Sequence, residues 1–552
     1  MTVMKPPRHK VAVIGLGAGG IVAVKNLLEE GFDVVGFERS SYIGGLWHFN
    51  EDENTLSVLE STATNISIDR GTFTDFPFPA GTPIHCAAKR VEDYLEAYAS
   101  HFNLRPHFRL STTVRSVSRE DEGEGRWRLD FEGRPSEWFD KVVVATGPHI
   151  KPVIPEFEGA DLFTGRLIHS KSFKKPEAFD GQKVIVVGLG NSGGDIVDAL
   201  IGHASHISLS HNGGAVIMPS LVNGVSVADS ISYRSLYLGG LVSALFPKQS
   251  ERLFDEAVHS ISRDAFGELD PSWGLDPTRS LKTANVVLSD TLIANFRSKA
   301  VKPIVGIRRF IGGRKMELTS GEVIEADAVI CCTGYNNDFS LLEKEFDPAS
   351  NPSPSWVNAP GSKNRPCPRL YQNVFSLKAP DSLAFLSCVF LLHGAFCLVD
   401  IASMCIAQVW SGRASLPPAP EMQRWMDRHE KMLCRAAQTG PVLPASVPAG
   451  DWLTWADKTA GMGAAEHLGW GWKGWRFWWR ERGLWRLVMD GPSTAAFWRL
   501  FPGRRKCWDG ARAEIIRINE EAERKRAQSS WRMGEVQAPS EVADFGLFNK
   551  QH

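Results

Sequence analysis

The strongest constraint on the fold is a glycine-rich pattern that directly follows a short apolar strand and occurs twice in the 552 residues. The first copy follows residues 11–14 and reads Gly15-Leu-Gly17-Ala-Gly19-Gly20. The second follows Lys183–Val187 and reads Gly188-Leu-Gly190-Asn-Ser-Gly193-Gly194. In a strand–turn–helix unit, such glycines permit a tight turn and let backbone amides approach a pyrophosphate. The repeat therefore predicts two dinucleotides and two nucleotide-binding domains.

An acidic residue follows the second strand of the first unit. A helix is predicted over residues 21–30 and a strand over Asp33–Phe37, after which comes Glu38. Its carboxylate would accept hydrogen bonds from both ribose hydroxyls and repel a 2′-phosphate, which favours FAD or NAD over NADP. The residues expected to bind this first dinucleotide are Gly15, Gly17, Ala18, Gly19, Gly20 and Glu38.

The second unit lacks such a marker. Its next strand, predicted over residues 207–210, leads into Ser210, His211 and Asn212, with neither an acid nor an arginine. The choice between NADPH and NADH therefore stays open. One dinucleotide is expected to be a flavin and the other a nicotinamide that reduces it. The residues expected at this second site are Gly188, Gly190, Asn191, Ser192, Gly193, Gly194 and Asp195, the last also explained by its interaction with the helix dipole.

Two further strands end in Thr-Gly, one on each side of the second unit. They precede Thr146-Gly147 and Thr333-Gly334 and are interpreted either as crossings between two domains or as ordinary strand ends. We predict an α/β fold with two three-layer dinucleotide-binding domains, the second inserted in the first. The first domain is predicted to comprise residues 1–160 and 335–552, the latter including a helical, Trp-rich C-terminal portion. The second is predicted to comprise residues 161–334, with a helical insertion at about 218–300.

Composition excludes several other classes of protein. The formal net charge is −1 and no polybasic tract occurs, so nothing argues for nucleic acid or an anionic membrane surface. The nine cysteines form no CxxC and show no zinc-ligand spacing, which predicts no metal site and a reducing, cytoplasmic location. The apolar stretch 383–410 is interrupted by His393 and Asp400, so it is interpreted as core with satisfied polar groups rather than as a membrane span.

Several ordered motifs resemble one family, the flavin-containing monooxygenases. The most specific is Phe163-Thr-Gly165-Arg-Leu-Ile-His169-Ser-Lys-Ser-Phe173, between the two glycine patterns. Glu38-Arg39 with Gly44-Gly45-Leu46-Trp47 is similar to the family's flavin-binding segment. The remaining similar segments are Thr64-Asn65 with residues 73–77, residues 191–195, Asp490-Gly-Pro492 and residues 508–512.

The resemblance implies an enzyme that uses FAD and NADPH to transfer one oxygen atom of dioxygen, held as a flavin C4a-hydroperoxide, to a nucleophilic nitrogen or sulfur of a small substrate such as an amine or alkaloid-like heterocycle. It implies Asn65 as the catalytic residue, because an amide both donates and accepts hydrogen bonds. Further cofactor-binding residues implied are Arg39, Gly45, Leu46, Trp47, Thr64, Asn65, Thr146, Gly147, Thr333 and Gly334.

Other interpretations remain. Baeyer–Villiger oxygenation of a ketone is less favoured because the identifying motif ends in Phe173 rather than tryptophan. A reductase would need a redox-active cysteine pair, and the adjacent Cys331-Cys332 lies in a late strand. A non-catalytic flavoprotein is a fourth interpretation. We favour a structural role for His169, as a hydrogen-bonding residue. The Trp-rich block 470–479 could form a pocket, a part of the core or a lid. A homo-oligomer is left open.

Overall fold

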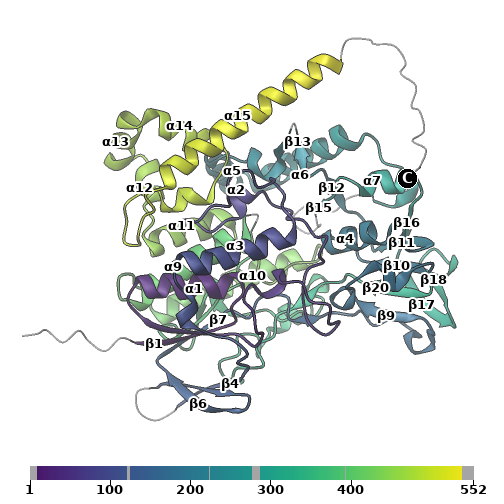
Figure 1. The fold of residues 1–552 in the computed structure, drawn as a ribbon, viewed down its shortest axis with the longest axis horizontal. Helices are drawn as coiled ribbons and strands as arrows, with labels where there is room; N and C mark the ends of the chain where they lie inside the picture. Colours follow the sequence, from purple (N-terminus) through teal and green to yellow (C-terminus); the bar gives the residue numbers. More distant parts are fainter. Residues whose placement is uncertain (1–8, 121–124, 223, 276–285, 392, 537–552) are drawn as a thin grey trace, which may run out of the picture.

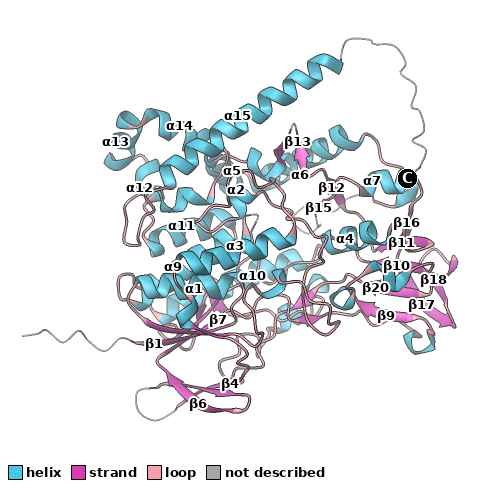
Figure 2. Ribbon diagram, in the orientation of Figure 1, coloured by secondary structure: helices cyan, strands magenta, loops and turns pink. Residues whose placement is uncertain are grey.

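The computed structural model describes residues 9–120, 125–222, 224–275, 286–391 and 393–536. Two separate parallel sheets dominate it, each with helices on one face (Figures 1 and 2). Both arise where the sequence has short β-branched runs that are buried on both sides, as strands inside a parallel sheet must be.

The first sheet has seven strands in the order β22-β23-β24-β7-β1-β2-β3. The four pairings from β24 to β3 are parallel, whereas the two at the β22 edge are antiparallel. The strands are β1 (Lys10–Ile14), β2 (Asp33–Phe37), β3 (Phe108–Arg109), β7 (Lys141–Val144), β22 (Leu370–Tyr371), β23 (Phe375–Ser376) and β24 (Leu383–Phe385).

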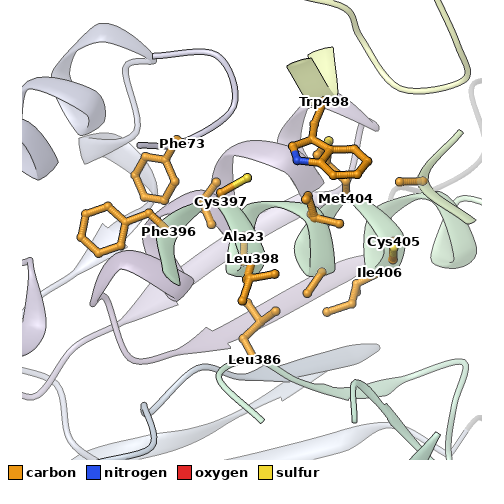
Figure 3. Packing of buried hydrophobic residues seen from close by; sticks show 14 of the residues in the cluster. Ala23, Phe73, Leu386, Phe396, Cys397, Leu398, Met404, Cys405, Ile406 and Trp498 are labelled. Carbon is orange, nitrogen blue, oxygen red and sulfur yellow. The ribbon is translucent and has the colours of Figure 1, made fainter. Parts of the chain in front are cut away.

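Different layers cover the two faces of this sheet. Helices α1 (Ala18–Glu29), α3 (Ala88–His101) and α9 (Ala395–Trp410) contribute to the core on one face. The three-stranded meander β4 (Val114–Arg119), β5 (Trp127–Phe131) and β6 (Arg134–Phe139) packs on the other, where Trp127 is fully buried. Within the stretch 383–410, β24 and α9 are core, as predicted, and Figure 3 shows the apolar side chains gathered along α9.

The second sheet repeats this arrangement with five parallel strands in the order β16-β11-β10-β20-β9. They are β9 (Arg166–His169), β10 (Lys183–Val187), β11 (His206–His211), β16 (Val301–Val305) and β20 (Ala328–Cys331). Residues of α4 (Asn191–Leu200) and α7 (Leu292–Arg297) form the core on one face. The meander β17 (Ile307–Gly312), β18 (Lys315–Leu318) and β19 (Val323–Glu325) packs on the other.

Two paired strands connect the halves. Strand β8 (Lys151–Pro152) leads out of the first half, β21 (Tyr335–Asn336) leads back, and the two pair antiparallel. The predicted fold class, with the second nucleotide-binding domain inserted in the first, is therefore confirmed. The exact domain boundaries stay a prediction, although no strand of either large sheet crosses them.

The remaining elements are an insertion after β11 and a C-terminal helical portion. The insertion contains β12 (Val216–Met218), β13 (Leu221–Val222), β14 (Val225–Ser226), α5 (Tyr233–Leu245), α6 (Pro247–Phe266) and β15 (Val286–Leu288). Outside it lie the short helices α2 (Ile68–Gly71) and α8 (Pro354–Val357). The C-terminal portion contains α10 (Ala419–Ala437), α11 (Ala449–Ala460), α12 (Ala464–Leu468), α13 (Trp472–Arg480), α14 (Arg482–Asp490) and α15 (Ala511–Val536).

A buried polar network ties distant parts of the chain together. The fully buried Arg499 donates from Nε to Thr74 Oγ1 (2.9 Å) and lies 3.4 Å from Asp75, which also pairs with Lys25. Asp400 accepts from the Thr74 amide and hydroxyl (2.8 and 2.7 Å), so its burial is satisfied as predicted. Although burial opposes ionisation, Arg499 and Lys25 hold the pKa of Asp75 below its ordinary value of 3.8.

His393 differs from the sequence-based prediction of a satisfied polar group. Its side chain is buried, yet neither ring nitrogen makes a standard hydrogen bond within the described part of the chain. Burial lowers its pKa to about 3, so the imidazole is neutral. A neutral ring is far less costly to bury than a charged one, which explains how the fold accommodates it.

Candidate functional site

The first glycine pattern forms a tight turn at the carboxyl end of β1. Gly15 has φ +97° and donates its amide to Phe37 O at 2.8 Å. A Cβ on Gly20 would overlap the carbonyl oxygen of Gly15, so α1 packs directly against the turn. The helix begins at Ala18, with Gly17 as its N-cap, and its first amides point along the helix axis where an anion binds.

Two other predicted segments meet this turn. A Cβ on Gly45 would lie 3.1 Å from Gly17 Cα, and Gly44 donates to Leu16 O at 2.9 Å. Leu46 and Trp47 follow in the short 3-10 helix Gly45–Trp47. The strand end before Thr146-Gly147 lies equally close, because a Cβ on Gly15 would be 2.7 Å from Ala145 O. The structure thus brings three predicted segments to one edge of the sheet.

Glu38 belongs to the same edge. Its buried carboxylate accepts from Leu16 N at 2.9 Å and from Ser40 N at 3.0 Å, so the glycine turn itself orients it. Each oxygen keeps a further lone pair, which fits a ribose hydroxyl. Arg39 is exposed and makes no ion pair within the described residues. The edge, lined by backbone and by one oriented acid, fits the adenosine half of FAD.

The segment carrying Asn65 is held by its neighbour. Thr64 donates its amide to Cys86 O at 2.9 Å, and its Oγ1 accepts from Cys86 N at 3.1 Å. The side chain of Asn65 is exposed and makes no hydrogen bond within the described residues, so it serves neither as a cap nor in a turn contact. Its amide is therefore available to a ligand.

His85 lies beside this segment and was missed by the sequence analysis. Its Nδ1 donates to Thr64 O at 2.7 Å, whereas the buried Nε2 has no hydrogen-bond partner in the part of the chain that the structure describes. With the proton on Nδ1, Nε2 is an unused acceptor. No motif marks this histidine, because its position depends on a contact between residues 21 positions apart.

The second glycine pattern has the same geometry. Gly188 has φ +116° and donates to Ser210 O at 2.8 Å, and a Cβ on Gly193 would overlap the Gly188 carbonyl. A Cβ on Gly188 would overlap the carbonyl oxygen of Cys332, which directly precedes Thr333-Gly334. Gly190 is the N-cap of α4, and Asn191 accepts from Leu288 N at 3.2 Å. Ser192 is exposed and Gly194 has open space where a Cβ would lie.

Asp195 differs from the prediction of an interaction with the helix dipole, because it is the fifth residue of α4 and lies beyond the first turn, where that interaction is strong. Its carboxylate accepts a hydrogen bond from Thr62 Oγ1 at 3.3 Å, which joins α4 to the segment that leads to Asn65. Burial raises the pKa of Asp195 to about 6. The second dinucleotide pattern is therefore linked to the segment that carries Asn65.

Among the described residues, the second ribose position carries no charged side chain that would select NADPH over NADH. Ser210 and His211 are buried, and His211 Nε2 donates to Trp273 O at 2.9 Å. Asn212 is exposed beside Gly306. These residues leave the choice between NADPH and NADH undecided, as in the sequence analysis.

The central motif residues are structural. His169 Nε2 donates to Gly334 O at 3.0 Å and Nδ1 accepts from Lys171 N at 3.1 Å, so both ring nitrogens hold backbone, as favoured above. Burial lowers the pKa of His169, and the ring is neutral. Phe173 is buried against Phe179, and Phe163 packs on Phe310.

Nothing in the cysteines supports disulfide chemistry. All nine are free. Burial raises the pKa of the Cys331 thiol to about 12 and that of Cys332 further, so neither is a thiolate at neutral pH. The described residues also contain no group of three or more His, Cys, Asp or Glu side chains that could hold a metal ion.

The fold and the two loops define a protein of the two-dinucleotide oxidoreductase class. The chain matches the flavin-binding monooxygenase-like family over residues 8–548, and it belongs to that family of flavin-dependent monooxygenases. The expected cofactors, FAD and NADPH, agree with this family. Among the helices that the structure describes, none has the length and apolar character to cross a membrane.

Individual relatives span nearly the whole chain. It is 39% identical over 522 residues to monooxygenase aurF of Gibberella zeae, covering 94% of this chain and 98% of the relative. It is 29% identical to flavin-containing monooxygenase 5 of Oryctolagus cuniculus, covering 93% and 92%. The structure of S-allyl-L-cysteine S-oxygenase from Allium sativum is similar with a TM-score of 0.59 at 20% identity, covering 95% and 99%. Cyclohexanone monooxygenase from Rhodococcus sp. Phi1 gives 0.56 at 17%, covering 82% and 97%.

Proposed function

We propose that this enzyme uses FAD and NADPH to transfer one oxygen atom of dioxygen to a nucleophilic nitrogen or sulfur of a small organic substrate, such as an amine or an alkaloid-like heterocycle. The observation that supports this most is the placement of residues 62–65. They contact α4 through Asp195, are anchored to Cys86, and present the free amide of Asn65.

The residues proposed to hold the cofactors follow from the two loops. The first loop, Glu38 and the turn at Gly45 would bind FAD, and the second loop with the first turn of α4 would bind the nicotinamide dinucleotide. When bound, the nicotinamide supplies hydride to the flavin, and the reduced flavin activates dioxygen.

The residues of this chain contribute by holding the side-chain amide of Asn65 in position. The Thr64–Cys86 hydrogen bonds fix the backbone on which Asn65 is carried, so its amide can donate to or accept from the reacting group without first breaking another bond. His85 holds the same backbone from the other side through Thr64 O. We propose Asn65 as the catalytic residue and His85 as its positioning residue.

Replacing Asn65 by alanine (N65A) tests this function. We expect bound FAD and NADPH oxidation to persist, while oxygenated product falls about a hundredfold and hydrogen peroxide rises, because a preorganised hydrogen bond is lost. NADPH consumed, product and peroxide are measured together with a tertiary amine, a thioether and a ketone. Asn351→Ala, at another exposed asparagine far along the chain, is the control.

Each substrate result discriminates between reactions. Product from the amine or thioether supports the proposal, whereas product from the ketone alone would establish Baeyer–Villiger oxygenation instead. Electron transfer to an added acceptor without any oxygenated product would indicate a reductase. Unchanged coupling in N65A would remove Asn65 from the catalytic site.

A further inference from the structure

The segment before Asn65 lies on the inserted domain, although it belongs to the first domain by sequence. Leu59 is only 9% exposed and is part of the same apolar cluster as Phe173, which forms the core on one face of the inserted domain's sheet. Because one domain buries an apolar side chain of the other, residues 51–62 are a docking segment rather than a free loop.

Lys174 of the inserted domain binds this docking segment with its ammonium group. Its Nζ donates to Thr55 O at 2.7 Å and to Ser57 Oγ at 2.9 Å. Burial lowers the pKa of Lys174, so the charge is held here at a cost that the two hydrogen bonds offset. The hydroxyl of Ser172 also donates to Glu53 O, at 3.0 Å. Two of these three acceptors are backbone carbonyls, so the bonds fix the path of the docking segment.

Two ion pairs add to the contact between the docking segment and the inserted domain. Arg166 pairs with Glu53, and Lys175 pairs with Glu51, each at 2.5 Å. All four side chains are more than a third exposed, and pairs of this kind contribute little to stability. The position of the docking segment therefore depends mainly on its buried contacts.

The chain after Asn65 is held by the insertion that follows β11. Ser67 Oγ donates to Asp229 Oδ1 at 2.5 Å, and both side chains are buried. Ser67 is the N-cap residue of α2, where a serine hydroxyl commonly bonds to the helix itself, but here it makes no such cap bond. Its hydroxyl binds the insertion instead, so a contact between the two domains replaces a local one.

Asn65 therefore lies between two contacts with the inserted domain. The docking segment ends before it at Thr62, which donates to a carboxylate of α4, and Ser67 follows after it. The first domain fixes the backbone between these two contacts, at Thr64.

We propose that Lys174 and Asp229 are positioning residues for Asn65. The domain expected to bind the nicotinamide dinucleotide then also determines where the side-chain amide of Asn65 lies. This role rests on the catalytic function proposed for Asn65, and neither positioning residue is expected to touch substrate or cofactor.

Product yield and amide exchange test this role in the FAD-loaded full chain. In Lys174→Met and in Asp229→Ala, we expect bound FAD and the KM for NADPH to stay within about twofold of the wild type. Product formed per NADPH oxidised, with the tertiary amine or the thioether, should fall about tenfold, because Asn65 loses its fixed position. Asp229→Asn keeps an acceptor for Ser67 and should restore the yield. Without substrate, the amides of residues 62–68 should exchange with deuterated water about tenfold faster in the first two variants.

The N65A background separates positioning from a general structural effect. Adding Lys174→Met or Asp229→Ala to N65A should lower the product yield no further, because the residue that they position has been removed. Lys141→Met is the matched control, since Lys141 is also partly buried and donates to a backbone carbonyl, Asp381 O, at 2.6 Å at the amino end of β7. It should keep the wild-type yield and exchange.

Unchanged exchange of residues 62–68 in both variants, or a further loss of yield when either is combined with N65A, overturns the proposal. Full yield in N65A alone overturns the catalytic function of Asn65 instead, and the exchange measured without substrate then shows separately whether the two contacts hold the segment. Ser67→Ala removes the same hydrogen bond and replaces Asp229→Ala if that variant does not retain FAD.

Discussion

At the scale of single residues, Asp195 has the most informative environment. It is the fifth residue of α4, just beyond the first turn and close to the loop proposed to bind the nicotinamide dinucleotide, and its pKa of about 6 means that it is neutral below that pH and charged above it. A charged carboxylate there would repel an anionic dinucleotide.

We therefore expect the affinity for NADP⁺ to fall as pH rises through about 6, and D195N to lack this step and bind about tenfold tighter at neutral pH. The asparagine oxygen still accepts from Thr62. Titration of bound NADP⁺ by flavin absorbance measures both proteins. Asp198→Asn, one turn along the helix with its carboxylate bonded to Thr291 and Asn295, should keep the step. A wild-type affinity that is flat across pH 6 would contradict this explanation.

Residues marked by local motifs could be predicted from the sequence, whereas residues whose role depends on tertiary contacts could not. The glycine turn places Gly17 beside Gly45, two residues that the motifs marked, although their binding roles stay predictions. His85 could not be found, because nothing in its local sequence shows that it bonds to Thr64. The bond from Thr62 to Asp195 was hidden for the same reason, since it joins residues of two domains.

At the scale of elements, the packing of α4 on its loop predicts different effects for substitutions at two neighbouring glycines. We expect G193A to abolish binding of the nicotinamide dinucleotide, because its methyl group would overlap the Gly188 carbonyl and displace the helix. G194A has open space and should bind normally. Both changes favour the helix equally by intrinsic propensity, so the difference isolates the packing.

Bound FAD and NADP⁺ are measured for each protein. Retained FAD in G193A would show that the first domain is intact. Equal affinity of the two variants for NADP⁺ would contradict the packing argument.

Elements with strong periodic patterns were predicted well, and weakly patterned ones were not. Helix α1 begins at Ala18, earlier than the predicted residue 21. The low helix propensity of Gly19 and Gly20 concealed this start, and Gly20 is required there by its close contact with Gly15. The β4–β6 meander was not predicted, since its strands mix charged and aromatic residues and gain stability from the sheet beneath. The exposure of the α13 tryptophans could not be predicted either, because composition does not show which face of a helix packs against the rest of the protein.

At the scale of the whole molecule, the buried network around Arg499 joins α1, the 73–76 segment, α9 and the C-terminal portion. We expect D75N to lower the free energy of unfolding by about 3 kcal/mol, because it removes the buried carboxylate that pairs with both Lys25 and Arg499 and leaves them with only Glu29 and Asp400 as acidic partners among the described residues. Urea unfolding followed by flavin release measures it. Glu322→Gln, which breaks a half-exposed pair with Lys302, should cost less than about 1 kcal/mol.

The effect depends on pH with a definite sign. Because the folded-state pKa of Asp75 lies below its ordinary 3.8, its stabilisation is present above that value and disappears as pH falls through the folded pKa. The stability difference between the wild type and D75N should therefore narrow in acid. If D75N lowered the free energy of unfolding at every pH by no more than Glu322→Gln does, the role given to the network would be contradicted.

The paired connection β8–β21 has a consequence for the order in which the chain folds during synthesis. The inserted domain has all of its sheet once residue 331 has been made, and its two ends lie side by side. The domain that starts first cannot finish until β24 and α9 have followed, at residue 410. On the ribosome, the half that begins the protein must therefore wait, with strand β7 lacking its neighbour β24, for a half that begins later and closes earlier.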